Sequence, residues 1–322
     1  MQAVAAYPKD TKRLLWEHRQ TVGEKTPIVA TKLIFNKVGN KDVYNPCVTF
    51  KLNGQEIMGA RVESRHSETD TEVKFFTKNA DGSWDPVSQK QKFKMQDPFV
   101  TVIGKETVIG GVETFEKPGH QGIGYRTVFY KGTTLANMQK FAVGPDGMKD
   151  IRLLEQKEAG NILVFTRPQG RTPSGENAGR GKIGVTTISS LEDLNPDNIN
   201  KATLFKPQFT NGEWGGTNEI HQLKDGKVGV LGHIARFDKQ GKRHYYPATF
   251  IFDPLTGAYS PLKILLERSE LPAGHSKRED LEDVLFSGGL KRHPGSKMAE
   301  LYIGGGDAET YHVVIEDPFQ DQ

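Results

Sequence analysis

Cysteine is nearly absent from this chain of 322 residues: Cys47 is the only one, so no disulfide can form within the chain. A lone cysteine is typical of proteins in a reducing compartment, and we expect a cytoplasmic location. No apolar run approaches the roughly 20 residues that cross a bilayer. Residues 1–10 lack the basic and apolar regions of a secretory signal. The sequence therefore predicts no membrane partner.

An excess of charge of either sign is also missing. The chain has 43 Lys and Arg against 40 Asp and Glu, which gives a net charge of +3. Binding to nucleic acid usually needs a strongly basic face, so we expect no nucleic-acid partner. Motifs of metal sites are lacking as well, since the sequence has no His-Glu-x-x-His, no paired cysteines and no calcium loop. We expect no bound metal.

Helical periodicity is scarce, and the candidates are short: residues 11–19, 189–200 and 276–283. Turn signals are abundant instead, because Asn-Gly and Asp-Gly pairs, which mark hairpins, recur along the chain. Between the turns lie short runs rich in β-branched and aromatic residues, at 48–52, 72–76, 99–103, 127–130, 161–166, 227–231, 249–252 and 300–303. This pattern predicts an all-β fold.

A coarse repeat organises these strands. In each unit a polar residue opens a hydrophobic strand, a hairpin follows, and a second strand ends in charged residues. The five units open at Asn45, Asp97, Asp150, Asn218 and Asp283. A unit of about 64 residues has room for the four strands of a propeller blade, and propellers have about 4–8 blades. We predict a single domain over residues 1–322, a five-bladed β-propeller.

In a propeller the innermost strands line a central funnel, so the residues that open them should meet at one mouth. This set consists of Asn45, Asp97, Asp150, Asn218 and either Asp283 or Ser287. The alternative interpretation is structural, because Asn and Asp readily form turns before proline, as at Asn45-Pro46 and Asp97-Pro98.

One motif points away from this interpretation. Residues 179–184 match the dinucleotide fingerprint G-x-G-x-x-G. That fingerprint needs a strand before it and a helix N-terminus behind it to hold the pyrophosphate, and neither is predicted here. We interpret residues 169–182 as a loop, a candidate flap over the funnel.

Three segments carry a family resemblance: residues 44–46 with 59–65, residues 95–101, and residues 301–307. In this order they resemble the five-bladed propellers of glycoside hydrolase family 130, the β-mannoside phosphorylases. Nearly the whole chain is more similar still to the domain of unknown function 1861, grouped as glycosyltransferase family 108, whose members are mannosyltransferase-phosphorylases acting on β-1,2-mannan. Gln96 and Phe99 depart from the Glu-Asp-Pro-Arg motif of family 130, but Asp97 is retained.

The resemblance implies an enzyme that converts β-1,2-mannosides and phosphate into mannose 1-phosphate with inversion, and the reverse. It makes Asp97 the catalytic acid. The candidates for sugar binding are Asn45, Arg61, Asp150, Glu219 and Asp307. The candidates for phosphate binding, several of which stand at strand ends, are Arg65, Lys149, Arg167, His233 and Tyr245. Phosphate is then a co-substrate, no cofactor is expected, and a nucleotide-mannose is a further candidate donor.

The chemistry separates the alternatives. An inverting phosphorylase needs one acid and a cationic site, because phosphate is itself an anionic nucleophile. An inverting hydrolase needs a second carboxylate to activate water, and Asp150 or Glu219 would have to supply it. A non-catalytic sugar-binding propeller needs neither. Glu63 and Glu113 are interpreted as structural residues that orient arginines through ion pairs.

Overall fold

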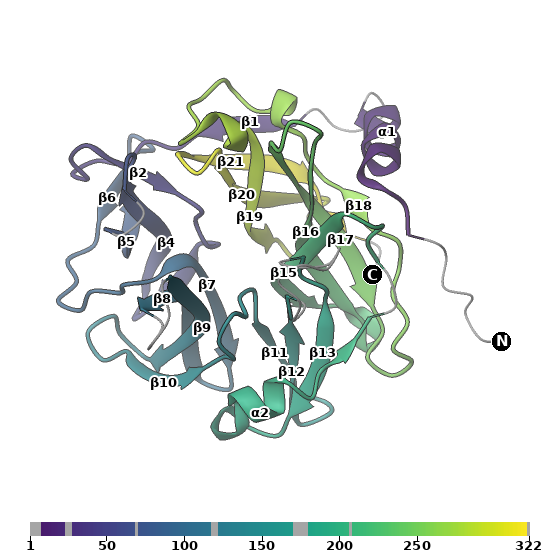
Figure 1. Cartoon of the computed structure of the whole chain (residues 1–322). Helices are drawn as coiled ribbons and strands as arrows, with labels where there is room; N and C mark the ends of the chain where they lie inside the picture. The colour runs from purple at the N-terminus through teal and green to yellow at the C-terminus, as the bar shows by residue number, and fades with distance from the viewer. Residues whose placement is uncertain are drawn as a thin grey trace.

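The computed structural model describes residues 8–22, 28–67, 70–116, 122–169, 180–205 and 208–320. Strands dominate them, so the predicted all-β class is confirmed. All eight predicted strand runs fall on observed strands, although residues 48–52 yield only the short β3. Figure 1 shows the sheets arranged around a common centre.

Three of the sheets are antiparallel units built from consecutive strands. The first has the order β2-β4-β5-β6 with β3 beside β4, the second β10-β9-β8-β7 and the third β11-β12-β13-β14. Their bounds are β2 Lys41–Tyr44, β3 Phe50–Leu52, β4 Gln55–Ser64, β5 Glu72–Lys78, β6 Trp84–Pro86, β7 Gln96–Ile103, β8 Glu106–Glu116, β9 Ile123–Gly132, β10 Gln139–Val143, β11 Arg152–Gln156, β12 Asn161–Thr166, β13 Gly184–Ile188 and β14 Thr203–Leu204.

The remaining strands form one eight-stranded sheet, β1-β21-β20-β19-β17-β16-β15 with β18 beside β17. Its bounds are β1 Val29–Lys32, β15 Glu213–Gln222, β16 Val228–Phe237, β17 Arg243–Phe252, β18 Lys263–Ile264, β19 Asp283–Arg292, β20 Met298–Gly305 and β21 Glu309–Glu316. Two antiparallel halves meet where β17 and β19 pair in parallel over only two residue pairs. At its edge Val29 of β1 pairs with Val314 of β21, so strands far apart in sequence lie side by side.

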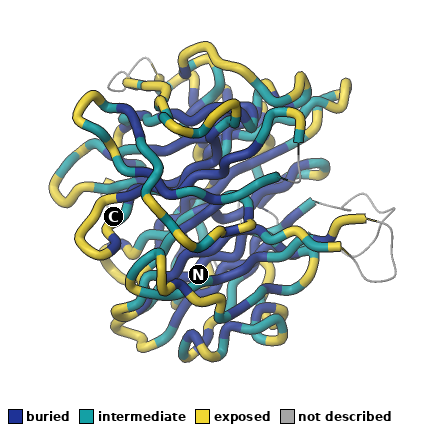
Figure 2. The backbone as a smooth tube through the Cα atoms, turned by 90° about the vertical axis from the view of Figure 1, so that its left-hand side faces the viewer, coloured by how far each residue is buried: buried dark blue, intermediate teal, exposed yellow. Residues whose placement is uncertain are grey.

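Apolar side chains fill the space between neighbouring sheets. Phe75 and Val128 share a buried cluster between the first and second sheets, and the second and third are joined in the same way. Tyr302 of β20 packs with Val43 and Phe76, which joins the last strands to the first sheet. Figure 2 shows the buried stretches inside the molecule and the exposed ones in the connecting loops. This burial of both faces fixes the inner strands, of which β7, β11, β15 and β19 contact one another.

The predicted helices are shorter than expected, with one exception. Helix α1, Thr11–Val22, forms as predicted, and its Leu14 and Leu15 enter the core. Residues 189–200 form a 3₁₀ turn, Leu191–Asp193, and the four-residue α2, Pro196–Ile199, because proline lacks an N–H and begins a helix. Residues 276–283 form only a 3₁₀ turn, Glu279–Leu281. None of the helices described is both long and apolar enough to pass through a bilayer.

The predicted flap lies mostly outside the described residues, which omit 170–179. Beyond this gap, β13 begins at Gly184, so a strand follows the G-x-G-x-x-G sequence. The motif therefore lacks the helix N-terminus that a dinucleotide site requires.

Candidate active site

Four of the predicted site residues share an uncommon backbone conformation. Asn45, Asp97, Asp150 and Asp307 have positive φ angles of 47°, 51°, 59° and 51°. This left-handed region costs a residue with a side chain about 1–2 kcal/mol, and Asn and Asp enter it most readily. At Asp97 the register between β7 and β8 also shifts, as in a β-bulge, which re-aims a side chain. Strain repeated in this way marks these positions as candidates for function.

Three of these residues, Asn45, Asp97 and Asp307, meet with Arg61 in a polar cluster that we call the Asp97 group. Asn45 Nδ2 donates to Asp97 Oδ1 at 2.9 Å and to Asp307 Oδ1 at 3.4 Å. Arg61 Nη1 lies 3.6 Å from Asp97 Oδ1. Burial raises the pKa of Asp307, Arg61 opposes the rise, and the charge of Asp97 adds to it. The Asp307 carboxyl therefore keeps its proton more readily than an ordinary aspartate does.

Arg61 is held from behind by Glu63, which is fully buried. Arg61 Nη2 lies 2.9 Å and 3.1 Å from the two Glu63 oxygens, so the predicted orienting ion pair is present. The hydroxyl of Tyr44 donates to the same carboxylate. Burial raises the pKa of Tyr44 far above its ordinary value, so that the hydroxyl stays a donor at neutral pH.

A second cluster, which we call the Arg167 group, consists of Asp150, Arg167, Asn218 and His233. Arg167 Nη1 contacts Asp150 Oδ2 at 3.0 Å, and its Nε donates to the Gly215 carbonyl at 2.8 Å. Burial alone would raise the pKa of Asp150, but Arg167, Lys149 and other neighbours bring it down to about 2. The Asp150 carboxylate is therefore ionised and engaged with arginine.

His233 belongs to this group but carries no charge at neutral pH, because burial lowers its pKa to about 3. Its Nδ1 lies 2.8 Å from Asn218 Oδ1, an acceptor, so Nδ1 carries the proton. Nε2 then presents a lone pair, and it is buried without a hydrogen-bond partner among the described residues. Tyr245 stacks on this ring with the centroids 5.5 Å apart. His233 can therefore accept a hydrogen bond from a hydroxyl of a ligand.

Arg152, which was not among the predicted site residues, interacts with both groups, since its charge acts on Asp150 and on Asp97. It is 5% exposed, and its Nε donates to the Asn218 carbonyl at 2.5 Å. Its guanidinium lies 4.0 Å from the ring of Phe99, the residue that replaces arginine in the family motif. Burial lowers the pKa of Arg152 to about 10, while Asp150 and Asp97 oppose the shift. The only signal in the sequence was an arginine two residues after Asp150, among the apolar residues of the strand.

Three of the predicted residues are placed differently. Arg65 forms a bidentate pair with Asp42, at 2.8 Å and 2.7 Å, and does not join the Arg167 group. The Glu219 carboxylate accepts from the backbone N–H of Leu290, so it ties β15 to β19. Lys149 is half-buried, and its charge acts on Asp150 and His233 without a direct bond to either being present.

The fifth position of the predicted ring is also used structurally. Asp283 lies at the junction of β17 and β19, where its Oδ2 is 2.6 Å from His244 Nδ1 and accepts from the hydroxyl of Tyr246. The alternative candidate, Ser287, donates to the carbonyl of Gly232 at 2.8 Å. Neither side chain joins the Asp97 group or the Arg167 group.

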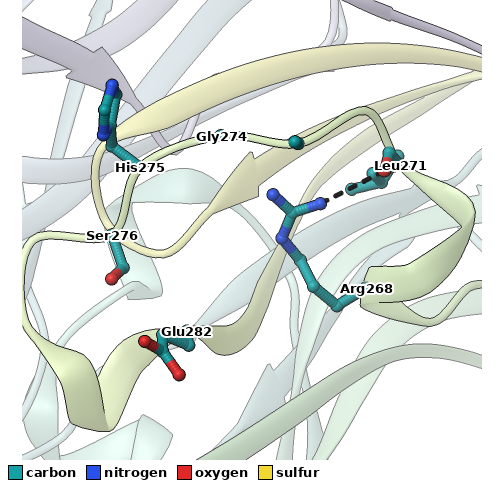
Figure 3. A pocket seen from close by; sticks show the side chains of 7 residues that line it. Arg268, Leu271, Gly274, His275, Ser276 and Glu282 are labelled. Atoms are coloured by element: carbon teal, nitrogen blue, oxygen red, sulfur yellow. Dashed lines mark hydrogen bonds between the residues drawn. The ribbon is translucent and has the colours of Figure 1, made fainter.

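A surface pocket of about 620 Å³ lies on the segment that leads into β19. Figure 3 shows its lining residues Arg268, Leu271, Gly274, His275, Ser276 and Glu282. Ser276 of this pocket lies close to Gly306, the residue before Asp307, since a Cβ on Gly306 would be 2.9 Å from it. Its arginine is engaged in the loop itself, with Nη1 donating to the Pro272 carbonyl at 2.9 Å.

The buried His233 should make stability depend on pH. Its pKa is 6.5 in the unfolded chain and about 3 in the folded one, so the unfolded chain binds more protons between these values. Stability should therefore be full above pH 6.5 and fall as the pH decreases, by at most about 1.4 kcal/mol per pH unit for one proton. We expect a flatter dependence in His233→Gln, measured by urea unfolding at pH 7 and pH 5. Equal differences in the two proteins would contradict the buried neutral state.

Comparison with known proteins supplies a context for this geometry. The sequence profile of the family described as "Protein of unknown function (DUF1861)" matches residues 20–321. A mannose phosphorylase from Leishmania mexicana, MPT-4, solved with a phosphate ion, is 30% identical, with 96% of this chain and 94% of that chain covered and a TM-score of 0.84. Among curated proteins no match is found.

Two further solved structures are informative. MPT-1, a GDP-Man-dependent mannosyltransferase from Leishmania mexicana, is 28% identical over 96% of this chain and 95% of its own, with a TM-score of 0.83. A β-1,2-mannobiose phosphorylase from Listeria innocua is 13% identical, covers 86% of this chain and 91% of its own, and has a TM-score of 0.57. At that identity the likeness concerns the fold alone.

Proposed function

Since the chain belongs to the DUF1861 family, as the sequence resemblance implied, we propose that it is an inverting phosphorylase of β-1,2-linked mannosides. MPT-4 and MPT-1, at 30% and 28% identity, are enzymes, so the chain is an enzyme as predicted. The proposed reaction breaks the glycosidic bond, joins the mannosyl group to inorganic phosphate as α-mannose 1-phosphate, and runs in both directions.

One observation carries the proposal: the buried Arg152 connects two polar clusters, since its charge interacts with Asp97 of one and with Asp150 of the other. On one side Asp97 would protonate the leaving oxygen, with the proton passing through a hydroxyl of the bound mannose. Asn45, Arg61 and Asp307 would hold that sugar. On the other side Arg167 and Arg152 are buried cations, and such groups bind a phosphate dianion well.

The electrostatics favour phosphate over a water-activating base. Arg167 contacts the carboxylate of Asp150, and its charge together with those of Lys149 and Arg152 lowers the pKa of Asp150 to about 2, against the effect of burial. A carboxylate with so low a pKa is a weak base, whereas three cations around one anion attract a second anion. His233 would accept a hydrogen bond from a hydroxyl of phosphate or of the sugar.

Product analysis tests the proposal directly. The protein should convert β-1,2-mannobiose to mannose 1-phosphate and mannose only when phosphate is present. Free mannose without phosphate would indicate a hydrolase. A second candidate, mannosyl transfer from GDP-mannose, is favoured by the likeness to MPT-1, and incubation with GDP-mannose and mannose tests it. Absence of turnover in all three reactions would leave a sugar-binding protein.

The proposal includes a closed, five-bladed propeller. The eight-stranded sheet consists of two antiparallel halves, β15–β18 and β19–β21 with β1, joined by two parallel residue pairs. Counted separately, the halves and the three other sheets make five units. The pairing of β1 with β21 supports closure, since it places the first and the last strand of the chain side by side in the last unit. An experimental structure with a different number of units would contradict this.

Gly216 offers a test of the phosphate half alone. A Cβ on this residue would lie 2.7 Å from Arg167 Cδ, 2.7 Å from Asp150 Oδ2 and 3.0 Å from His233 Cε1. We expect Gly216→Ala to displace these side chains and to raise the KM for phosphate about tenfold or more, the equivalent of one charge-assisted contact. Initial rates at varied phosphate check this. An unchanged KM for phosphate would place the phosphate elsewhere, and mannose binding serves as the control.

A further inference from the structure

Lys277 is a buried lysine that contacts Glu63, the residue behind Arg61 of the Asp97 group. It stands in the segment before β19, and its side chain is 6% exposed. Its Nζ lies 2.6 Å from Glu63 Oε2 and 2.7 Å from the carbonyl of Ser67. A lysine is rarely buried in this way unless it is paired, so the contact with Glu63 is a specific one.

The backbone around Lys277 is fixed beside Asp307. Lys277 N donates to the carbonyl of Gly306 at 2.7 Å, and His275 N donates to Glu309 Oε1 at 3.1 Å. Glu309 is itself paired with Lys32 at 2.7 Å. The segment therefore joins the β19–β21 strands to the first sheet, and its lysine enters at a defined position.

Glu63 is the point on which three donors converge. It receives Tyr44, Arg61 and Lys277, and it has no exposure of its own. Without Lys277, its negative charge would be balanced by Arg61 alone. Arg61 is shared, because its Nη2 faces Glu63 and its Nη1 faces Asp97. If Lys277 were absent, the attraction between Glu63 and Arg61 would be stronger and would draw the guanidinium away from Asp97.

We propose that Lys277 is a positioning residue, which rests on the proposed function of Asp97 as the acid. By balancing the charge of Glu63, Lys277 allows Arg61 to keep its Nη1 directed toward Asp97 and the sugar. The residue acts through Glu63 and Arg61 and touches no reacting atom. Loss of the ammonium should lower kcat more than it raises the KM for mannoside.

The kinetic test compares matched variants. We expect Lys277→Met to lower kcat about 10–100-fold, the range that small misplacements in an active site produce. Lys277→Arg should recover most of this, because it keeps a cation. Lys32→Met is the control, since it removes a lysine contact beneath the same segment without touching Glu63. In a Glu63→Gln background, Lys277→Met should add little, because the charge that it balances is gone.

Arginine side-chain NMR supplies a readout that needs no turnover. The Nε–Hε signal of Arg61, assigned by its loss in Arg61→Lys, should shift in Lys277→Met and not in Lys32→Met. If the wild-type chain has no phosphorylase activity, the proposed function fails, and this signal still decides the coupling between Lys277 and Arg61. The inference is wrong if Lys277→Met behaves like Lys32→Met in both measurements. It is also wrong if Lys277→Met lowers kcat by the same factor in the Glu63→Gln background as in the wild type. If Lys277→Met does not fold, Lys277→Gln replaces it.

Discussion

Asp97→Asn is expected to lower turnover about 10²–10⁴-fold, the contribution typical of a positioned acid. The amide keeps the size of the side chain and an oxygen for Asn45 and Arg61, but it cannot deliver a proton. Asn45, Arg61 and Asp307 remain, so mannose should bind with nearly wild-type affinity. Steady-state rates of phosphorolysis and calorimetric titration with mannose measure the two effects.

Asp150→Asn is the matched control for that experiment. In a phosphorylase it removes a partner of Arg167 and should leave measurable activity, because phosphate attacks. In a hydrolase that used Asp150 as the base, its loss would be as damaging as the loss of Asp97. Full activity in Asp97→Asn would remove Asp97 from the mechanism altogether.

Arg167→Met should have the second large effect, on both stability and phosphate use. Arg167 and Asp150 are both buried, and removal of one partner leaves a buried charge without compensation, at a cost of about 3–5 kcal/mol. The apparent affinity for phosphate should also fall about tenfold or more, because a charge-assisted contact is lost. Urea unfolding and the phosphate dependence of the rate measure the two quantities.

The double variant Arg167→Met with Asp150→Asn separates these roles. Neutralising both partners should restore much of the lost stability, since no buried charge is left unpaired. Affinity for phosphate should stay low, because the cation is still missing. A double variant that regained phosphate affinity would mean that Arg167 serves only to pair with Asp150.

Local patterns carried most of the fold prediction. Short runs rich in β-branched and aromatic residues, with Asn-Gly or Asp-Gly turns between them, located the strands, because both signals depend on neighbours in sequence. The prediction of helix length was wrong in two places. In residues 189–200 the helix begins only at Pro196. Near Lys277 the backbone is not helical, because Lys277 N donates to the carbonyl of Gly306. The repeat in the sequence predicted two separate units, opening at Asn218 and Asp283, where the structure has the two halves of one eight-stranded sheet.

The site was predictable where one residue type repeats at one structural position. Asn45 and Asp97 each open a unit of the repeat, whereas Asp307 was predicted only from the family resemblance; in the structure all three have positive φ angles and meet. Lys277 left no such signal, since its partner Glu63 is 214 residues away in sequence. The neutrality of His233 depends on burial by residues from other strands, which a sequence pattern does not contain.

The pairing of β1 with β21 has a consequence for how the chain acquires its fold. Val29 and Val314 are partners, so this contact closes a loop of about 285 residues, and closure entropy rises with loop length. During synthesis β1 emerges early and has no partner until the last strands are made. Contacts of such long range slow folding. We therefore expect the sheet that contains β1 and β21 to be completed last. A chain truncated before β21 would leave β1 and the edge of β20 unpaired, and unpaired strand edges promote aggregation.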